Sequence, residues 1–136
     1  MLSDETIYQM VLSCVLEITE DPDTAEQILM ESAKLDPNLS LYEDFGMQSL
    51  DLLDLMFKLE KKFKIKIDSK KLGLEKEGVF VEDILTESGA ETLKNTLPEI
   101  KDKIEPGLYS NSILKLLTIQ TFVNLIKKEL IEEERI

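Results

Sequence analysis

The most restrictive feature of the sequence is a helical pattern that runs from residue 49 to residue 63. Its letters are SLDLLDLMFKLEKKF, and neither Gly nor Pro interrupts them. Apolar residues recur at steps of four, three and four, at Leu52, Met56, Leu59 and Phe63. A stripe with this spacing forms one face of a helix and has to be buried against other elements. We therefore predict a helix from Ser49 to about Phe63 with one buried face.

Three more helices are predicted around this one. Ser3 can cap the first, whose apolar residues have helical spacing: Ile7, Met10, Val11, Cys14, Val15 and Ile18. A short second helix is expected between Asp21 and Asp36. Thr118 can cap the last, whose apolar face is Ile119, Phe122, Val123, Ile126 and Leu130. Because βαβ alternation is absent, the predicted fold class is all-α, a small helical bundle.

The remaining segments are loops or short elements. Residues 38–48 are expected to form a packed loop that ends at Gly46 and leads into the helix at Ser49. FKIKI, residues 63–67, is a possible strand. Residues 69–109 are polar, broken by Gly and Pro, and include two short predicted helices near 80–95 and 98–104. With 136 residues, the chain is expected to be a single domain that contains this segment as an insertion.

Composition excludes several classes of function. The chain has no His, which removes Ser-His triads and His-ligated zinc, and we predict no catalytic residue and no metal site. A net charge of -12 disfavours nucleic acid and anionic membranes and favours basic protein partners. The single cysteine, Cys14, is expected to be buried. Since no apolar run is long enough for a membrane span and no signal peptide is recognisable, we expect a cytoplasmic protein without stable membrane insertion.

Ser49, at the start of the helix, has two possible roles. Its hydroxyl can cap the helix, which typically contributes about 1 kcal/mol. The same position also suits a phosphodiester, because free N–H groups and the positive end of the helix dipole favour an anion there. The surrounding residues, EDFGMQSLDLLDLMFKLEKKFKIKI, resemble the signature of acyl carrier proteins. The matching positions are Asp44, Phe45, Gly46, Ser49, Leu50, Asp51, Asp54, Leu55, Leu59, Glu60 and Phe63.

The resemblance implies a non-catalytic carrier with an acyl-carrier-like four-helix bundle. It implies that Ser49 carries 4′-phosphopantetheine from coenzyme A and presents acyl groups as thioesters, for a specialised fatty-acid, lipid or polyketide-type pathway. The expected carrier is a monomer, and its implied partners are a phosphopantetheinyl transferase and acyl-transferring or condensing enzymes. The implied docking residues are Leu50, Asp51, Asp54, Phe57, Lys58 and Lys61. The candidates for sheltering the acyl chain, which serve equally well as ordinary core, are Leu55, Met56, Leu59, Ile119 and Val123.

Three features depart from the family pattern. Gln48 replaces the Asp that usually precedes the serine, which predicts weaker recognition by a transferase. The helix at 49–63 carries three acidic residues and three lysines, with Asp54 and Lys58 placed to form a pair. The insertion at 69–109 is the third departure. These features leave an alternative open: a non-phosphopantetheinylated protein of the same fold that acts as an acidic interaction subunit, with Ser49 only as a helix cap.

Overall fold

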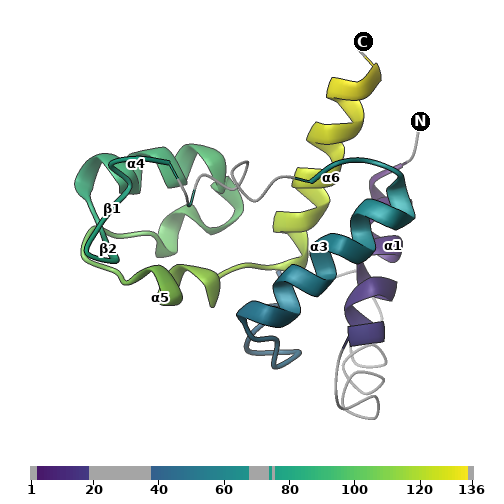
Figure 1. Ribbon diagram of the computed structural model, residues 1–136, viewed down its shortest axis with the longest axis horizontal. Coiled ribbons are helices and arrows are strands. Elements are labelled where there is room, and N and C mark those ends of the chain that lie inside the picture. Colours follow the sequence, from purple (N-terminus) through teal and green to yellow (C-terminus); the bar gives the residue numbers. More distant parts are fainter. Residues whose placement is uncertain (1–2, 19–37, 68–73, 75, 135–136) are drawn as a thin grey trace. The chain divides into compact units, whose positions relative to one another are not determined.

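The computed structural model describes residues 3–18, 38–67, 74 and 76–134 (Figure 1). The chain divides into two compact units. The first unit consists of Met1–Ile67 and Thr118–Ile136, and the second is Asp68–Leu117. The second unit therefore covers the expected insertion and continues to Leu117. The short helix expected between Asp21 and Asp36 lies outside the described residues.

Helix α1, Asp4–Ile18, opens the first unit as predicted. The Ser3 hydroxyl accepts a hydrogen bond from the Thr6 N–H at 3.2 Å, which confirms Ser3 as the cap. Asp4 and Glu5 occupy the first turn, where carboxylates interact favourably with the helix dipole. The buried face of the helix consists of Ile7, Tyr8, Val11, Leu12, Cys14 and Val15.

Helix α3, Ser49–Phe63, has the predicted bounds. Its buried residues are Leu52, Leu55, Met56, Leu59 and Phe63. The helix ends at Lys64, which has a left-handed backbone conformation with φ of 56°. After this turn the chain is irregular, so the possible strand at 63–67 does not form. Instead, the Ile67 N–H donates to the Glu60 carboxylate at 2.8 Å, which ties the end of this segment to the helix.

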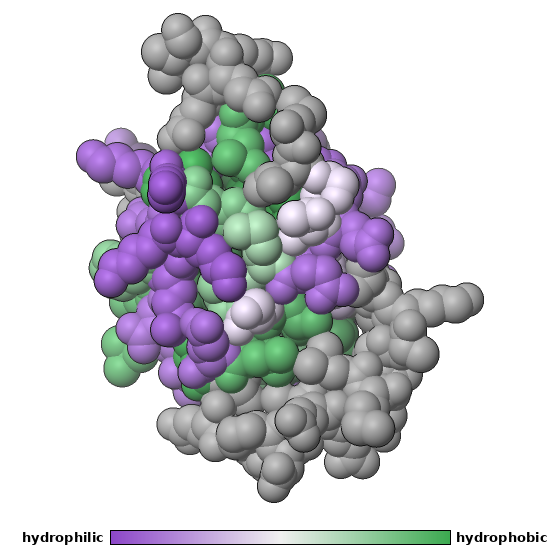
Figure 2. Space-filling view, turned by 90° about the vertical axis from the view of Figure 1, so that its right-hand side faces the viewer, coloured by the Kyte–Doolittle hydropathy of each residue, from purple (hydrophilic) through white to green (hydrophobic). Residues whose placement is uncertain are grey.

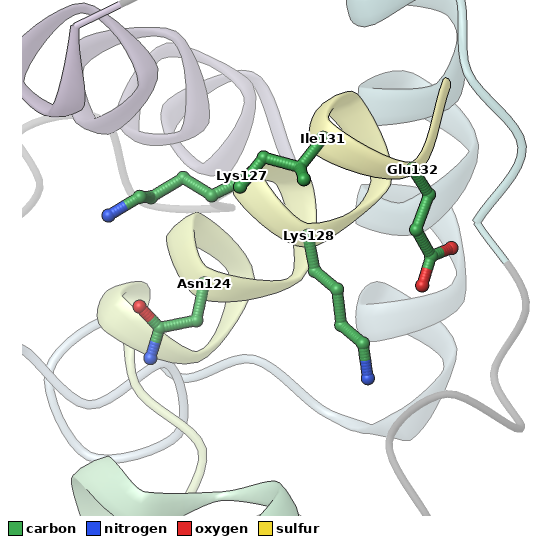
Figure 3. Close-up of a pocket in the computed structure, with 5 residues that line it drawn as sticks. All are labelled: Asn124, Lys127, Lys128, Ile131 and Glu132. Carbon is green, nitrogen blue, oxygen red and sulfur yellow. The ribbon is translucent and has the colours of Figure 1, made fainter. Parts of the chain in front are cut away.

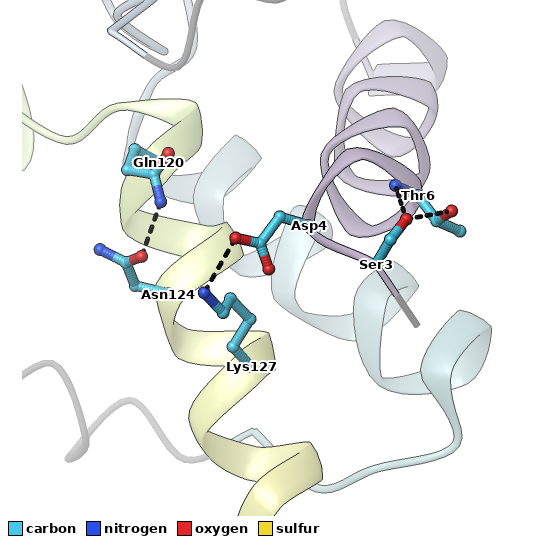
Figure 4. A network of polar contacts seen from close by, with 6 residues as sticks. All are labelled: Ser3, Asp4, Thr6, Gln120, Asn124 and Lys127. Carbon is cyan, nitrogen blue, oxygen red and sulfur yellow. Dashed lines mark hydrogen bonds and ion pairs between the residues drawn. The ribbon is translucent and has the colours of Figure 1, made fainter. Parts of the chain in front are cut away.

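Helix α6, Ile119–Glu134, completes the first unit and begins at the predicted cap. Thr118 and Thr121 exchange hydrogen bonds between backbone N–H and side-chain oxygen, at 3.1 and 3.3 Å. Helix α1 packs against both α3 and α6. At the surface, Lys127 of α6 forms an ion pair of 3.1 Å with Asp4 of α1 (Figure 4).

Hydrophobic and hydrophilic side chains are separated on one face of the molecule. Figure 2 shows hydrophobic residues gathered in a band between groups of hydrophilic side chains on the face drawn. Among the described residues, no helix combines the length and the apolar character that a bilayer crossing needs.

The second unit begins with a small hairpin. Strands β1, Phe80–Val81, and β2, Ile84–Leu85, pair antiparallel, with Phe80 opposite Leu85 and Val81 opposite Ile84. They are followed by helix α4, Glu87–Thr96, the 3₁₀ helix η2, Pro98–Lys103, and the short helix α5, Ser110–Leu114. The helix predicted to begin near residue 80 is therefore wrong at its start, because residues 80–85 form the two strands and the turn between them. The helix predicted near 98–104 is present as η2.

Helix α4 lies directly on the backbone that precedes the hairpin. Thr86 caps it by accepting a hydrogen bond from the Gly89 N–H at 2.9 Å, and its hydroxyl donates to the Gly78 carbonyl at 2.7 Å. A Cβ at Gly89 would lie 2.7 Å from Val79 Cα and closer still to the Val79 carbonyl oxygen. Only glycine allows this approach. The second unit has its own apolar core: Val79, Leu85, Ala90, Leu93, Leu97, Ile100, Ile104, Ile113 and Leu117.

Candidate functional site

The loop before α3 is packed rather than open, as predicted. Its apolar side chains are buried: Leu39, Leu41, Phe45 and Met47. The Asp44 carboxylate accepts a hydrogen bond from the Ser40 N–H at 2.6 Å. Gly46, at φ of 66°, makes the turn that places Gln48 and Ser49 at the start of the helix. The loop thus fixes the backbone immediately before the candidate serine.

Backbone hydrogen bonds also connect this loop to the start of α6. Ser40 forms an isolated antiparallel bridge with Thr118. The Ile119 N–H donates to the Leu39 carbonyl at 3.1 Å. The loop that leads to Ser49 is therefore in contact with a segment that lies far from it in the sequence.

Ser49 is the first residue of α3 and is exposed. The cap position belongs to Gln48, which has an extended backbone with φ of -96° and ψ of 177°. Within the described part of the chain, the Ser49 hydroxyl has no hydrogen bond. The hydroxyl is thus available at the positive end of the helix dipole, where an anionic group is favoured.

Asp51 closes the beginning of the helix instead of Ser49. Its carboxylate accepts a hydrogen bond from the Gln48 N–H at 2.8 Å, which is one arm of a capping box. Asp51, a predicted docking residue, is therefore engaged in holding its own helix and is only partly exposed.

The outer face of α3 carries exposed apolar side chains. Leu50, Leu53 and Phe57 are 74%, 49% and 61% exposed, and their spacing of three and four residues places them on one side of the helix. Asp54 and Lys61 are exposed at positions that share this side. We call Leu50, Leu53, Asp54, Phe57 and Lys61 the outer face of α3. Leu53 was missing from the sequence prediction, although its distance of three residues from Leu50 indicates the same side.

The lysines of α3 are not equivalent. Lys58 forms an ion pair of 3.3 Å with Glu17 of α1, so the predicted pairing of Asp54 with Lys58 is wrong. The Lys62 ammonium is 3.4 Å from the Ser13 hydroxyl, also on α1. Opposite charges four residues apart on a helix often pair, which predicted an ion pair between Asp54 and Lys58. The packing of α1 against α3 instead brings the Glu17 carboxylate next to Lys58. Two lysines thus reach toward α1, and Lys61 is exposed on the outer face of α3.

The residues suggested as an acyl shelter lie in the core of the first unit. Leu55, Met56, Leu59, Ile119 and Val123 are all buried. A separate hollow lies along α6, lined by Asn124, Lys127, Lys128, Ile131 and Glu132 (Figure 3). Among the residues that the structure describes, its lining has two lysines and a single apolar side chain, which does not suit a hydrocarbon chain. None of the five buried candidates lines this hollow.

Cys14 is buried on α1, as predicted. Burial raises the pKa of its thiol, and the nearby Glu17 acts in the same direction, against the opposing effects of Lys62 and Lys58. A thiol held protonated in the core is a packing residue rather than a nucleophile.

Ser49 thus lies exposed at the start of an amphipathic helix, where a bound anionic group would be favoured. Residues 23–77, which include this serine and all of α3, match the family described as "Phosphopantetheine attachment site". The domain thus defines a carrier whose cofactor is 4′-phosphopantetheine.

A second comparison defines the family. The chain is 38% identical over 71 residues to a protein named "Acyl carrier protein" from Cyanophora paradoxa, a match that covers 52% of this chain and 68% of that relative. The chain belongs to the acyl carrier protein family. Proteins of this family carry acyl groups and do not catalyse the reactions themselves. No solved structure matches the chain significantly.

Proposed function

We propose that Ser49 is the attachment site of 4′-phosphopantetheine and that the chain presents acyl groups as thioesters on this arm. The observation that supports this most directly is that Ser49 is exposed and that its hydroxyl does not cap the helix. It is exposed at the first position of α3, while the capping contact to the Gln48 N–H comes from Asp51. A serine whose hydroxyl has no hydrogen-bond partner among the described residues is free to become a phosphodiester.

The start of α3 fits the phosphate of the arm. In the described structure, the backbone N–H groups of Ser49 and Leu50 have no partner within the chain, as is usual in the first turn of a helix. These donors and the helix dipole favour the negative charge that the phosphodiester brings. When attached, the group supplies a flexible thiol that holds the acyl chain. The residues of this chain provide the exposed hydroxyl, a rigid loop behind it and a surface for partner enzymes.

The outer face of α3 is the proposed docking surface for a phosphopantetheinyl transferase and for acyl-transferring or condensing enzymes. Exposed Leu50, Leu53 and Phe57 favour an apolar recess on the partner. Asp54 favours a basic residue opposite it, and Lys61 favours an acidic one. Asp51 and Lys58, also predicted docking residues, are engaged within the chain and contribute less.

The pathway is proposed to be specialised fatty-acid, lipid or polyketide-type synthesis. Two features support a dedicated set of partner enzymes: the mixed charge of α3 and the presence of the second unit. The acyl chain itself would be sheltered among Leu55, Met56, Leu59, Ile119 and Val123, which requires these core side chains to move apart. The proposal includes a cytoplasmic monomer, which light scattering and fractionation of host cells would test.

Intact-mass spectrometry of the protein purified from its native host tests the attachment. The expected result is the mass of one phosphopantetheinyl group, with or without an acyl chain, located on Ser49 by fragmentation. Ser49→Ala should remove this mass, whereas the control Ser13→Ala, which changes a serine on α1, should retain it. If the wild type remains unmodified after incubation with coenzyme A and several transferases, the carrier mechanism is wrong for this chain.

Gln48 favours one alternative function. It removes the charge that the family usually places before the serine, and it lies exposed at the cap position of α3. An unmodified chain would then act as an acidic interaction subunit. This alternative predicts that Ser49→Ala preserves biological function in the host, whereas the carrier proposal predicts its complete loss.

A further inference from the structure

The second unit presents an exposed apolar patch that its own core does not use. Val81, Ile84 and Tyr109 are 60%, 38% and 60% exposed. Val81 and Ile84 come from the two strands of the hairpin, and Tyr109 immediately precedes α5 (Figure 1). We call these three residues the hairpin patch.

Strand register places the three side chains on one surface. Val81 is directly opposite Ile84, and Ile84 forms an antiparallel bridge with Tyr109. Residues directly opposite each other in antiparallel strands point to the same side. The neighbouring pair, Phe80 and Leu85, points to the other side, where Leu85 is buried in the core.

Residues 107–110 form a third segment that is hydrogen-bonded to the hairpin. The Leu85 N–H donates to the Leu108 carbonyl, and the Gly107 N–H donates to the Leu85 carbonyl, both at 2.8 Å. The Ser110 N–H donates to the Asp83 carbonyl at 2.9 Å. The hairpin patch is therefore a preformed surface, which lowers the entropy lost when a partner binds.

The turn between the strands adds two exposed carboxylates. Glu82 and Asp83 have φ of 53° and 66°, the conformation of a type I′ turn, which Asn and Gly adopt far more readily. Folding alone therefore does not explain an acidic pair at this turn. Backbone strain retained in this way is commonly associated with a functional surface.

We propose that the hairpin patch, together with Glu82 and Asp83, docks a protein partner whose contact surface combines an apolar recess with Lys or Arg side chains. The two carboxylates complement a basic partner and disfavour nucleic acid and anionic lipid. They also disfavour a symmetric contact between two copies of the chain, which would bring like charges together. The inference concerns a surface outside α3 and goes beyond the proposed attachment of 4′-phosphopantetheine.

Site-specific cross-linking identifies the partner, and binding to the purified partner tests the surface. The full chain is expressed in its native host with Tyr109→p-benzoylphenylalanine, and the cross-linked protein is identified by mass spectrometry and purified. Its dissociation constant is then measured with the wild type and with three double variants. The first variant, Glu82→Asn with Asp83→Gly, removes both carboxylates but suits the type I′ turn. The second, Val81→Thr with Ile84→Thr, removes apolar surface. The third, Glu91→Gln with Asp102→Asn, is a charge-matched control on exposed positions.

The proposal expects each hairpin variant to bind at least about tenfold more weakly, with the control within about twofold of the wild type. Since the Asn-Gly turn stabilises the hairpin, weaker binding together with a more stable second unit cannot be attributed to misfolding. Added salt should weaken binding of the wild type more than binding of the Asn-Gly variant. Cross-linking only to a second copy, no cross-linking, or equal binding by all variants would overturn the proposal. Ser49→Ala should leave the cross-link unchanged, which separates this result from the fate of the attachment site.

Discussion

Replacement of Ser49 by Ala separates the two possible roles of this residue through its effect on stability. If the hydroxyl capped α3, its removal would cost about 1 kcal/mol, within a range of about 0.5 to 2 kcal/mol. In the structure the cap residue is Gln48, and the Ser49 hydroxyl bonds to no described residue. Ala is also the better helix former, by up to about 0.5 kcal/mol. We therefore expect Ser49→Ala to leave the free energy of unfolding unchanged or to raise it by up to about 0.5 kcal/mol.

Asp51→Ala provides the matched comparison two residues further along the helix. It removes the 2.8 Å hydrogen bond to the Gln48 N–H and a carboxylate from the first turn. Together these are expected to cost about 1 to 1.5 kcal/mol. Native-state hydrogen exchange at the Leu55 and Leu59 amides, in the buried centre of α3, measures both variants. A loss of 1 kcal/mol or more in Ser49→Ala, or no loss in Asp51→Ala, would refute the assignment of the cap.

Three other changes have distinct expected outcomes. Gly89→Ala should destabilise the second unit by about 1 to 3 kcal/mol, seen in its amide exchange, because the new Cβ would overlap the Val79 backbone. Gln48→Asp should speed phosphopantetheinylation at the proposed site up to about tenfold in a transferase assay, since it would supply the carboxylate for a charge-assisted contact; an unchanged rate would contradict the prediction that Gln48 weakens recognition by the transferase. Because burial raises the pKa of Cys14, the folded state binds the thiol proton more tightly, so urea unfolding should show stability falling as the pH rises above 9.0, the thiol's usual pKa. Cys14→Ala should reduce this slope, and an identical slope in both proteins would contradict the argument.

The sequence was sufficient for the long helices because each has an apolar stripe and a recognisable first turn. Ser3, Ser49 and Thr118 marked the beginnings of α1, α3 and α6, and the structure places those beginnings within one residue. The role of Ser49 in capping could not be predicted with the same accuracy. A shift of one position moves the cap from Ser49 to Gln48, and hydrophobic spacing does not resolve such a shift.

Elements that depend on distant contacts were not predictable from local patterns. Phe80, Ile84 and Leu85 have spacings that also suit a helix, and a turn made of Glu and Asp lacks the usual hairpin signal of Asn or Gly. Pairing with residues 107–110 stabilises this hairpin. Helix α5 has only five residues, too few for a periodic pattern. The partner of Lys58 was missed for a similar reason, since Glu17 lies 41 residues away in the sequence.

The contact between the loop before Ser49 and the start of α6 sets an order of events during synthesis of the protein. Leu39 and Ser40 meet Ile119 and Thr118, which a ribosome adds about 70 residues after Ser49. At about 5 to 20 residues per second, this interval lasts roughly 4 to 14 seconds. During that time Ser49 is already part of the nascent chain, but the loop that positions it still lacks its contacts with Thr118 and Ile119. If Ser49 is the attachment site, as proposed, a transferase that recognises the folded loop would act only after translation has passed the second unit, and incompletely synthesised chains would not be modified.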